Sequence, residues 1–132
     1  MIPEVADLVG KPFAHCGRGP DAYDCFGITQ EVFRRLGIAL EWPPADLFEK
    51  SEHELIIEGL AAFPNELVTT GPFGPGDVII MGTNENLHHM APMVTHKHCL
   101  HVSKTSAGVH LTSIESLRRL GYGHMEVRRW LG

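Results

Sequence analysis

The chain has few cysteines, no long apolar run and no excess of positive charge, and each absence excludes a class of protein. Three cysteines among 132 residues are an odd number and too few for a disulfide framework. No apolar stretch approaches the roughly 20 residues of a membrane-spanning helix. A formal charge of −5 argues against binding to a phosphate backbone. We therefore expect no membrane association and no nucleic-acid partner.

The N-terminal residues also lack the features of a signal peptide. The start Met1-Ile2-Pro3-Glu4-Val5 carries no basic segment, and no long apolar segment follows it. This predicts synthesis in the cytoplasm, where thiols stay reduced. A length of 132 residues with 43% hydrophobic and 20% charged residues is typical of one globular unit. We expect residues 1–132 to form a single domain.

Helical patterns dominate the first half of the chain and strand patterns the second. Caps and apolar spacing predict helices at residues 3–9, 25–36, 52–62 and 113–120. Apolar runs and alternation predict strands at residues 77–81, 89–94, 98–104, 109–113 and 125–130. Because strands mostly follow helices and do not alternate with them, the order predicts an α+β fold.

One of the cysteines, Cys25, opens an amphipathic helix, with Asp24 before it as a candidate cap and Gly27 leaving the approach open. Unpaired N–H groups at a helix start stabilise a thiolate and lower its pKa. The same groups can hold the oxyanion of a tetrahedral intermediate. Cys25 is therefore a candidate nucleophile, although an inert buried cysteine is the commoner case. We interpret Cys16, in a loop, and Cys99, in a strand, as non-catalytic.

Histidines cluster in the strand region, at His88, His89, His96, His98 and His101. With a three-residue loop between the two strands, Ala91 lies opposite His101, and His89 shares a face with that pair. A two-residue loop would bring His88 to that face instead. We expect His89 and His101 to be neighbours and His88 to point the other way. Pro92 removes a ladder donor and indicates an edge or a bulge.

Part of this cluster offers zinc-binding chemistry as an alternative. The run contains His96, His98, Cys99 and His101, which are residue types that ligate zinc. Strand alternation splits these side chains over two faces, and no second spaced pair completes a structural site. We therefore expect neither a metal nor a cofactor, and keep a small zinc-binding module as the less favoured alternative.

Several segments together carry a pattern typical of one family. Residues 9–27 and 36–38 surround the segment Asp24-Cys25-Phe26-Gly27, and four further segments follow at residues 75–79, 89–91, 100–102 and 108–114. These segments resemble the NlpC family of papain-like cell-wall cysteine peptidases. The resemblance implies a papain-like NlpC fold, in which the helix carrying the nucleophile packs on an antiparallel sheet.

The resemblance also implies roles and a substrate. It implies Cys25 as nucleophile, His89 as base and His101 as the group that orients the base. The implied reaction is cleavage of peptide bonds in peptidoglycan stem peptides through an acyl-enzyme, with the peptide as partner. An aromatic residue such as Phe26 after the nucleophile resembles the phage-tail branch, whereas many members carry Tyr in place of Phe13.

That branch implies assembly of the protein into a phage or prophage tail. Export by a non-classical route is the other fate that fits a chain without a signal peptide. A non-catalytic tail assembly protein that keeps the fold is the alternative function.

Overall fold

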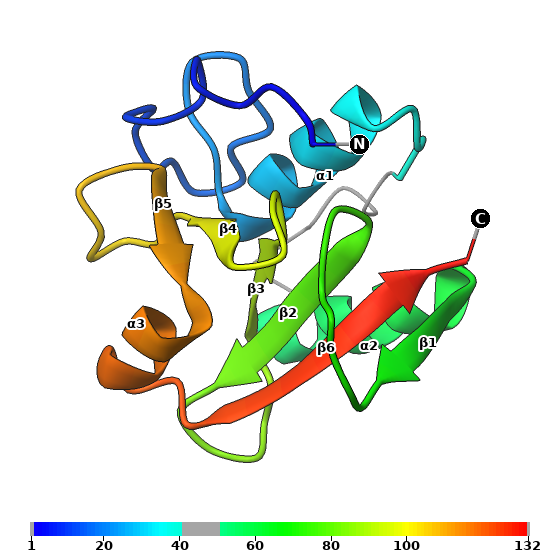
Figure 1. The fold of residues 1–132 in the computed structure, drawn as a ribbon. Coiled ribbons are helices and arrows are strands. Elements are labelled where there is room, and N and C mark those ends of the chain that lie inside the picture. Colours follow the sequence, from blue (N-terminus) through cyan, green and yellow to red (C-terminus); the bar gives the residue numbers. More distant parts are fainter. Residues whose placement is uncertain (1, 41–50, 132) are drawn as a thin grey trace.

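A computed structural model describes residues 2–40 and 51–131 of the chain (Figure 1). In chain order its helices and strands are α1 (Cys25–Arg35), α2 (Glu52–Ala62), β1 (Asn65–Val68), β2 (Asp77–Gly82), β3 (His89–Pro92), β4 (His98–His101), β5 (His110–Ser113), α3 (Ile114–Arg119) and β6 (His124–Trp130). Within the described ranges, no helix is both long enough and apolar enough to cross a membrane.

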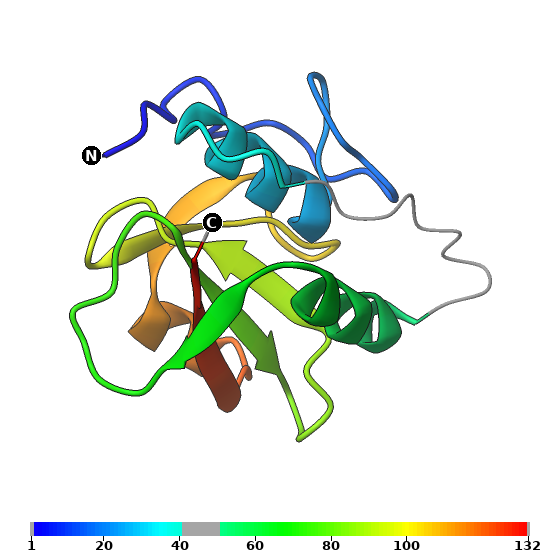
Figure 2. The same cartoon turned by 90° about the vertical axis from the view of Figure 1, so that its right-hand side faces the viewer.

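The strands form two antiparallel sheets. The larger has the order β1-β6-β2-β3, and the smaller pairs β4 with β5. A bridge between Met93 and Cys99 joins the two sheets next to the edge strand β3. Helix α1 contacts β3 and β4, and Figure 2 shows it stacked over the strands. The expected α+β fold, with the helix that carries Cys25 packed on an antiparallel sheet, is confirmed.

The sequence of α1 explains this packing. Its helical spacing predicts an apolar stripe of Ile28, Val32, Phe33 and Leu36. The first three are fully buried against the sheet, and Leu36 is half-buried. The helix ends before Gly37, whose φ of +82° is one that glycine adopts without strain. The apolar stripe therefore fixes which side of α1 faces the strands, and with it where Cys25 lies.

The sheet has an apolar cluster on each face. Val78, Ile80 and Met90 belong to the cluster that includes α1. Ile79 and Ala91 belong to a second cluster, which contains Leu117 of α3, Met93, Cys99 and Val127. This alternation between adjacent residues is what a sheet covered on both sides requires.

The predicted N-terminal helix is wrong, because residues 6–10 form turns. The Gly10 N–H donates to the carbonyl of Val109 at 2.7 Å, and the Val109 N–H donates to the carbonyl of Lys11 at 2.8 Å. Backbone groups of this segment thus bond to a distant part of the chain, which competes with helical bonding.

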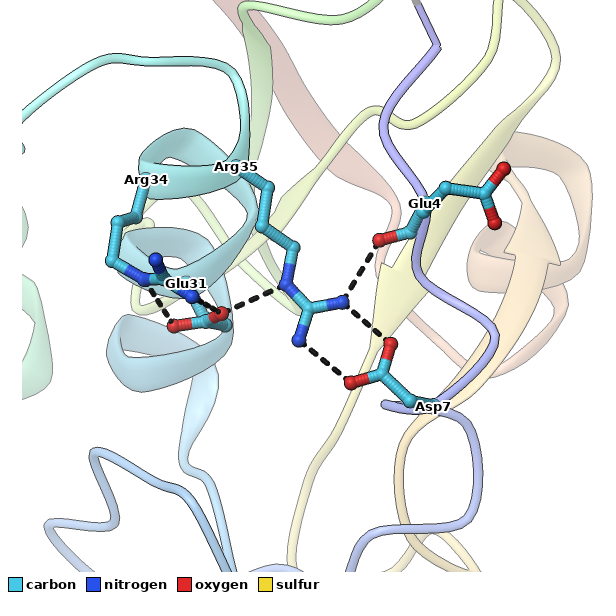
Figure 3. A network of polar contacts seen from close by, with 5 residues as sticks. All are labelled: Glu4, Asp7, Glu31, Arg34 and Arg35. Atoms are coloured by element: carbon cyan, nitrogen blue, oxygen red, sulfur yellow. Dashed lines mark hydrogen bonds and ion pairs between the residues drawn. The ribbon is translucent and has the colours of Figure 1, made fainter.

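Side chains also hold the N-terminal segment against α1 (Figure 3). The Arg35 guanidinium donates two hydrogen bonds to Asp7, at 2.5 and 2.7 Å, and a third to the Glu4 carbonyl at 2.8 Å. It also donates to Glu31, which is shared with Arg34. This pairing holds the pKa of Asp7 at about 2, chiefly through the hydrogen bonds from Arg35.

The sequence patterns also failed to predict β1 and made the strands near the site too long. Strand β1 pairs with β6 in the register Asn65↔Trp130, and two of its four residues are exposed. Its sequence places two polar residues before two apolar ones and therefore carries no alternation to detect. The strand predicted at residues 98–104 ends at His101, and that predicted at residues 89–94 ends at Pro92. Pro92 lies on an edge strand, as its missing N–H predicts.

Candidate active site

The start of α1 is fixed by a network around Asp24. One carboxylate oxygen accepts hydrogen bonds from the Gly27 N–H at 2.7 Å and from Arg18 at 2.5 Å. The Asp24 N–H donates to the carbonyl of Gly17 at 3.0 Å. A Cβ on Gly27 would lie 2.0 Å from that carbonyl oxygen. Gly27 therefore lets the preceding loop pack against the helix that Cys25 begins.

The Cys25 side chain lines a cavity of about 270 Å³ next to this network. Only 5% of the residue is exposed, and its carbonyl accepts a hydrogen bond from the Thr29 hydroxyl at 2.8 Å. The cavity is bounded by the loop before α1, the start of α2 and segments flanking β3, β4 and α3. Its lining includes Cys16, Glu52, His88, His89, Lys104 and Tyr122.

The electrostatics of the thiol differ from the expectation for a helix start. Burial raises the pKa of Cys25 well above its usual value, and the carboxylates of Asp24 and Glu52 raise it further. The backbone N–H of Met90 and the charge of Arg18 act in the opposite direction but are outweighed. The lowered pKa expected from the sequence reflects the effect of the helix start alone. It leaves out the loss of water around the buried thiol, which acts in the opposite direction. In this structure burial therefore favours the protonated form of the Cys25 thiol.

The two histidines named from the sequence lie side by side. His89 is the first residue of β3 and His101 the last of β4. The bridge between Met93 and Cys99 has the register that a three-residue loop predicts. The rings of His89 and His101 meet edge to face, with centroids 4.9 Å apart and planes at 88°. Since His89 also lines the cavity with Cys25, the structure brings all three candidate residues into one region.

Burial keeps both histidines neutral. His89 is 5% exposed and His101 is 1% exposed. Burial, His101 and His88 together lower the pKa of His89 to about 3. Burial and His110 lower the pKa of His101 to about 4. Nε2 of His89 and both ring nitrogens of His101 are buried and have no hydrogen-bond partner among the described residues.

Two further rings adjoin the histidine pair. Tyr122 stacks on His89 with centroids 5.2 Å apart and planes at 15°. His110 meets His101 edge to face at 5.1 Å. His110 lies opposite His101 in the pairing of β4 with β5, so correct strand pairing would have revealed it. Tyr122 follows α3 after Leu120 and Gly121, and no spacing pattern points to it.

His88 does not take the position expected for it. It precedes β3, so strand alternation does not apply, and it lines the same cavity as His89. Its ring centroid is 6.3 Å from that of Tyr122. His88 is thus a half-buried residue of the cavity wall.

The residues considered for zinc binding lie in different environments. His96 is exposed in the loop after β3, His98 is half-buried, and Cys99 is fully buried. Burial raises the pKa of Cys99 to about 12, which disfavours the thiolate that zinc binds. Among residues 2–40 and 51–131, no group of three or more His, Cys, Asp or Glu side chains is arranged to hold a metal ion.

A thiol, a neutral imidazole and a second imidazole in one buried region are the components of nucleophilic acyl transfer. Residues 10–123 match the NlpC/P60 family. A comparison with curated proteins finds none that matches the chain. Because the family match spans most of the sequence and includes the segments that carry the thiol and both histidines, the chain belongs to the NlpC/P60 family, whose members are generally cell-wall cysteine peptidases or amidases.

Proposed function

We propose that the protein is a thiol hydrolase that cleaves peptide bonds in peptidoglycan stem peptides, with residues 1–132 acting as one domain. Cys25 is the nucleophile, His89 the base and His101 the orienting group. One observation carries the proposal: Cys25 and His89 line the same cavity, and the His89 ring contacts His101 at 4.9 Å. Family membership supports the substrate class.

The reaction follows from these positions. His89 takes the thiol proton while Sγ of Cys25 attacks the carbonyl carbon of the peptide bond. The C–N bond then breaks, and His89 delivers the proton to the leaving amine. Water, deprotonated by His89, hydrolyses the thioester and releases the new carboxylate, and the proton returns to the sulfur. No cofactor enters these steps.

The helix start and the second histidine assist this chemistry. The first N–H groups of a helix have no partner within it, so the Cys25 N–H is suited to hold the developing oxyanion. Asp24 already occupies the N–H of Gly27. A hydrogen bond between Nε2 of His89 and a ring nitrogen of His101 would fix the tautomer of the base. Both sets of nitrogens are buried and unpaired among the described residues.

Digestion of purified muropeptides, followed by mass spectrometry, tests the proposal. The wild-type protein should release fragments that end at one defined peptide bond, and Cys25→Ala should release none. An exposed-loop variant, His96→Ala, serves as the control and should cleave at the same bond. Cleavage by Cys25→Ala equal to wild type would overturn the enzyme proposal, as would a wild-type protein inert on every stem peptide.

A non-catalytic tail protein is the second candidate, and the burial of the thiol favours it. Only 5% of Cys25 is exposed, and burial raises the pKa of its thiol. Alkylation by iodoacetamide near pH 7 separates the candidates. A thiol activated by His89 reacts faster than the exposed Cys16 and the buried Cys99. A Cys25 slower than Cys16 would favour the structural candidate.

We also propose that the protein is a tail component of a phage or prophage. The proposal depends on Phe26, the aromatic residue after the nucleophile. Phe26 is 1% exposed, and the Arg18 guanidinium lies 5.6 Å from its ring centroid. Mass spectrometry of purified tail particles should detect the protein, and its presence only as free protein would instead support export by another route.

A further inference from the structure

Tyr122 covers the histidine pair from the loop after α3. Its ring lies nearly parallel to that of His89, with centroids 5.2 Å apart and planes at 15°. It meets His101 edge to face at 5.9 Å. Burial raises the pKa of its phenol, with smaller contributions from Cys25 and Glu52, which places Tyr122 within the electrostatic reach of the thiol.

The proposed reaction makes His89 an imidazolium, and its described surroundings oppose that charge. Burial and the neighbouring His101 and His88 all favour the neutral ring. No carboxylate among the described residues contributes in the other direction. The proposed orienting group is itself a histidine, so it does not bring to His89 the negative charge that an aspartate in its place would bring.

An aromatic face can supply part of this missing stabilisation. The face of a tyrosine ring is negative and attracts a cation placed over it, more strongly where water is excluded. The parallel arrangement puts the His89 ring over the face of Tyr122. The same contact restricts rotation of the His89 ring about its χ2 angle.

We propose that Tyr122 is a positioning residue for the base, holding the plane of the His89 ring and stabilising its imidazolium through the aromatic face. This inference depends on the proposed roles of Cys25 and His89. It assigns the effect to the ring of Tyr122, and the hydroxyl is not required.

Tyr122 also borders two cavities. It lines the cavity of Cys25, and it lines a second one of about 170 Å³ that is bounded by His101, Ser106 and His110. An aliphatic side chain at position 122 would leave the face of His89 open to water from either side. The ring therefore excludes water where the proton is transferred.

Three variants separate the ring, the hydroxyl and a general packing effect. Tyr122→Phe keeps the ring, and Tyr122→Leu removes it. Phe63→Leu is a matched control, because Phe63 lies 5.2 Å from Trp130, is half-buried and is absent from the lining of the Cys25 cavity. The measurements are kcat and KM on one stem peptide and the rate of Cys25 alkylation by iodoacetamide at pH 7.

We expect Tyr122→Leu to lower kcat and the alkylation rate about tenfold, with KM within about twofold of wild type, as the loss of a partly desolvated cation–π contact implies. Tyr122→Phe should stay within about threefold of wild type in both rates, and Phe63→Leu should leave both unchanged. If circular dichroism shows that Tyr122→Leu does not fold, Tyr122→Met provides the aliphatic comparison.

Three other patterns would overturn the inference. Equal losses in Tyr122→Phe and Tyr122→Leu would assign the effect to the hydroxyl. A rise in KM alone would make Tyr122 part of the substrate wall, and equal losses in Phe63→Leu would indicate general destabilisation. If the wild type cleaves no peptide but the alkylation rates follow the expected order, the proposed function fails and the role of Tyr122 stands.

Discussion

The two sides of the site are built by different means. On the thiol side, the segment that leads into Cys25 is held by hydrogen bonds of Asp24 to Gly27, Arg18 and Gly17, all between 2.5 and 3.0 Å. On the histidine side, three buried ring nitrogens lack partners among the described residues, and ring contacts at 4.9 to 5.9 Å hold the imidazoles.

This difference shows how position and protonation are set separately. The hydrogen bonds place the thiol, but burial decides its protonation and raises its pKa. On the other side, packing places the imidazoles, and burial lowers the pKa of His89 to about 3 and that of His101 to about 4. Burial therefore favours a neutral thiol beside neutral imidazoles, and in the proposed reaction charge would separate only as the thiol proton moves to His89.

The largest expected effect comes from removing the proposed nucleophile on the thiol side or the proposed base on the histidine side. Cys25→Ala and His89→Ala should each lower kcat/KM by at least about 10³-fold, because nucleophile and base act as a unit and their losses do not add. Cys25→Ser should do nearly the same, since a hydroxyl stays protonated and is a weaker nucleophile. Steady-state kinetics on one stem peptide measures this. A double variant much worse than either single variant would show that the two sides act independently.

A smaller effect is expected at His101, which orients the base and takes no proton from the thiol. His101→Gln should lower kcat about 10- to 100-fold. Where the orienting group is a carboxylate, its replacement by a neutral amide costs roughly 10⁴-fold in kcat. We expect a smaller loss here because burial favours the neutral form of His101, and water can replace it in part. His101→Ala should lose more than His101→Gln. Losses at His101 equal to those of Cys25→Ala would refute this ranking of the residues.

The histidine side also predicts acid sensitivity of the fold. Unfolded imidazoles take up protons below about pH 6.5, whereas His89 and His101 do so only near pH 3 to 4. Stability is therefore complete above pH 6.5 and falls as the pH decreases toward 4. At pH 5 each residue should lower the free energy of unfolding by about 2 kcal/mol relative to pH 8.

Urea denaturation at both pH values measures this loss. His101→Gln should remove the contribution of His101 to the pH dependence of the free energy of unfolding. The variant His96→Ala, at an exposed histidine, should keep the pH dependence of the wild type. An identical pH dependence in His101→Gln and wild type would contradict the assignment to the buried histidines.

The features of the site that the sequence predicted depend on contacts between residues close together in the chain. The cap at Asp24 and the apolar stripe behind Cys25 are local patterns, and both are confirmed. The register that brings His89 beside His101 followed from a loop of three residues and strand alternation. Local patterns of spacing and capping therefore predicted the placement of the candidate triad.

Features that depend on distant contacts were not predictable in this way. Tyr122 reaches His89 only because α3 packs on the second face of the sheet, and no spacing encodes that contact. The N-terminal turns depend on bonds to Val109, about 100 residues away along the chain. The raised pKa of Cys25 is likewise a result of burial by the whole fold.

The smallest expected effect tests the thiol side. Asp24→Ala removes the cap of α1 and should lower the free energy of unfolding by about 1 kcal/mol. Asp24→Asn keeps an acceptor for the Gly27 N–H and should lose less than half of that. Because the Asp24 carboxylate raises the pKa of Cys25, the neutral amide should also speed alkylation of the thiol. Denaturant titration and iodoacetamide kinetics measure the two effects, and slower alkylation in Asp24→Asn would show that the carboxylate serves the thiol mainly by placing it.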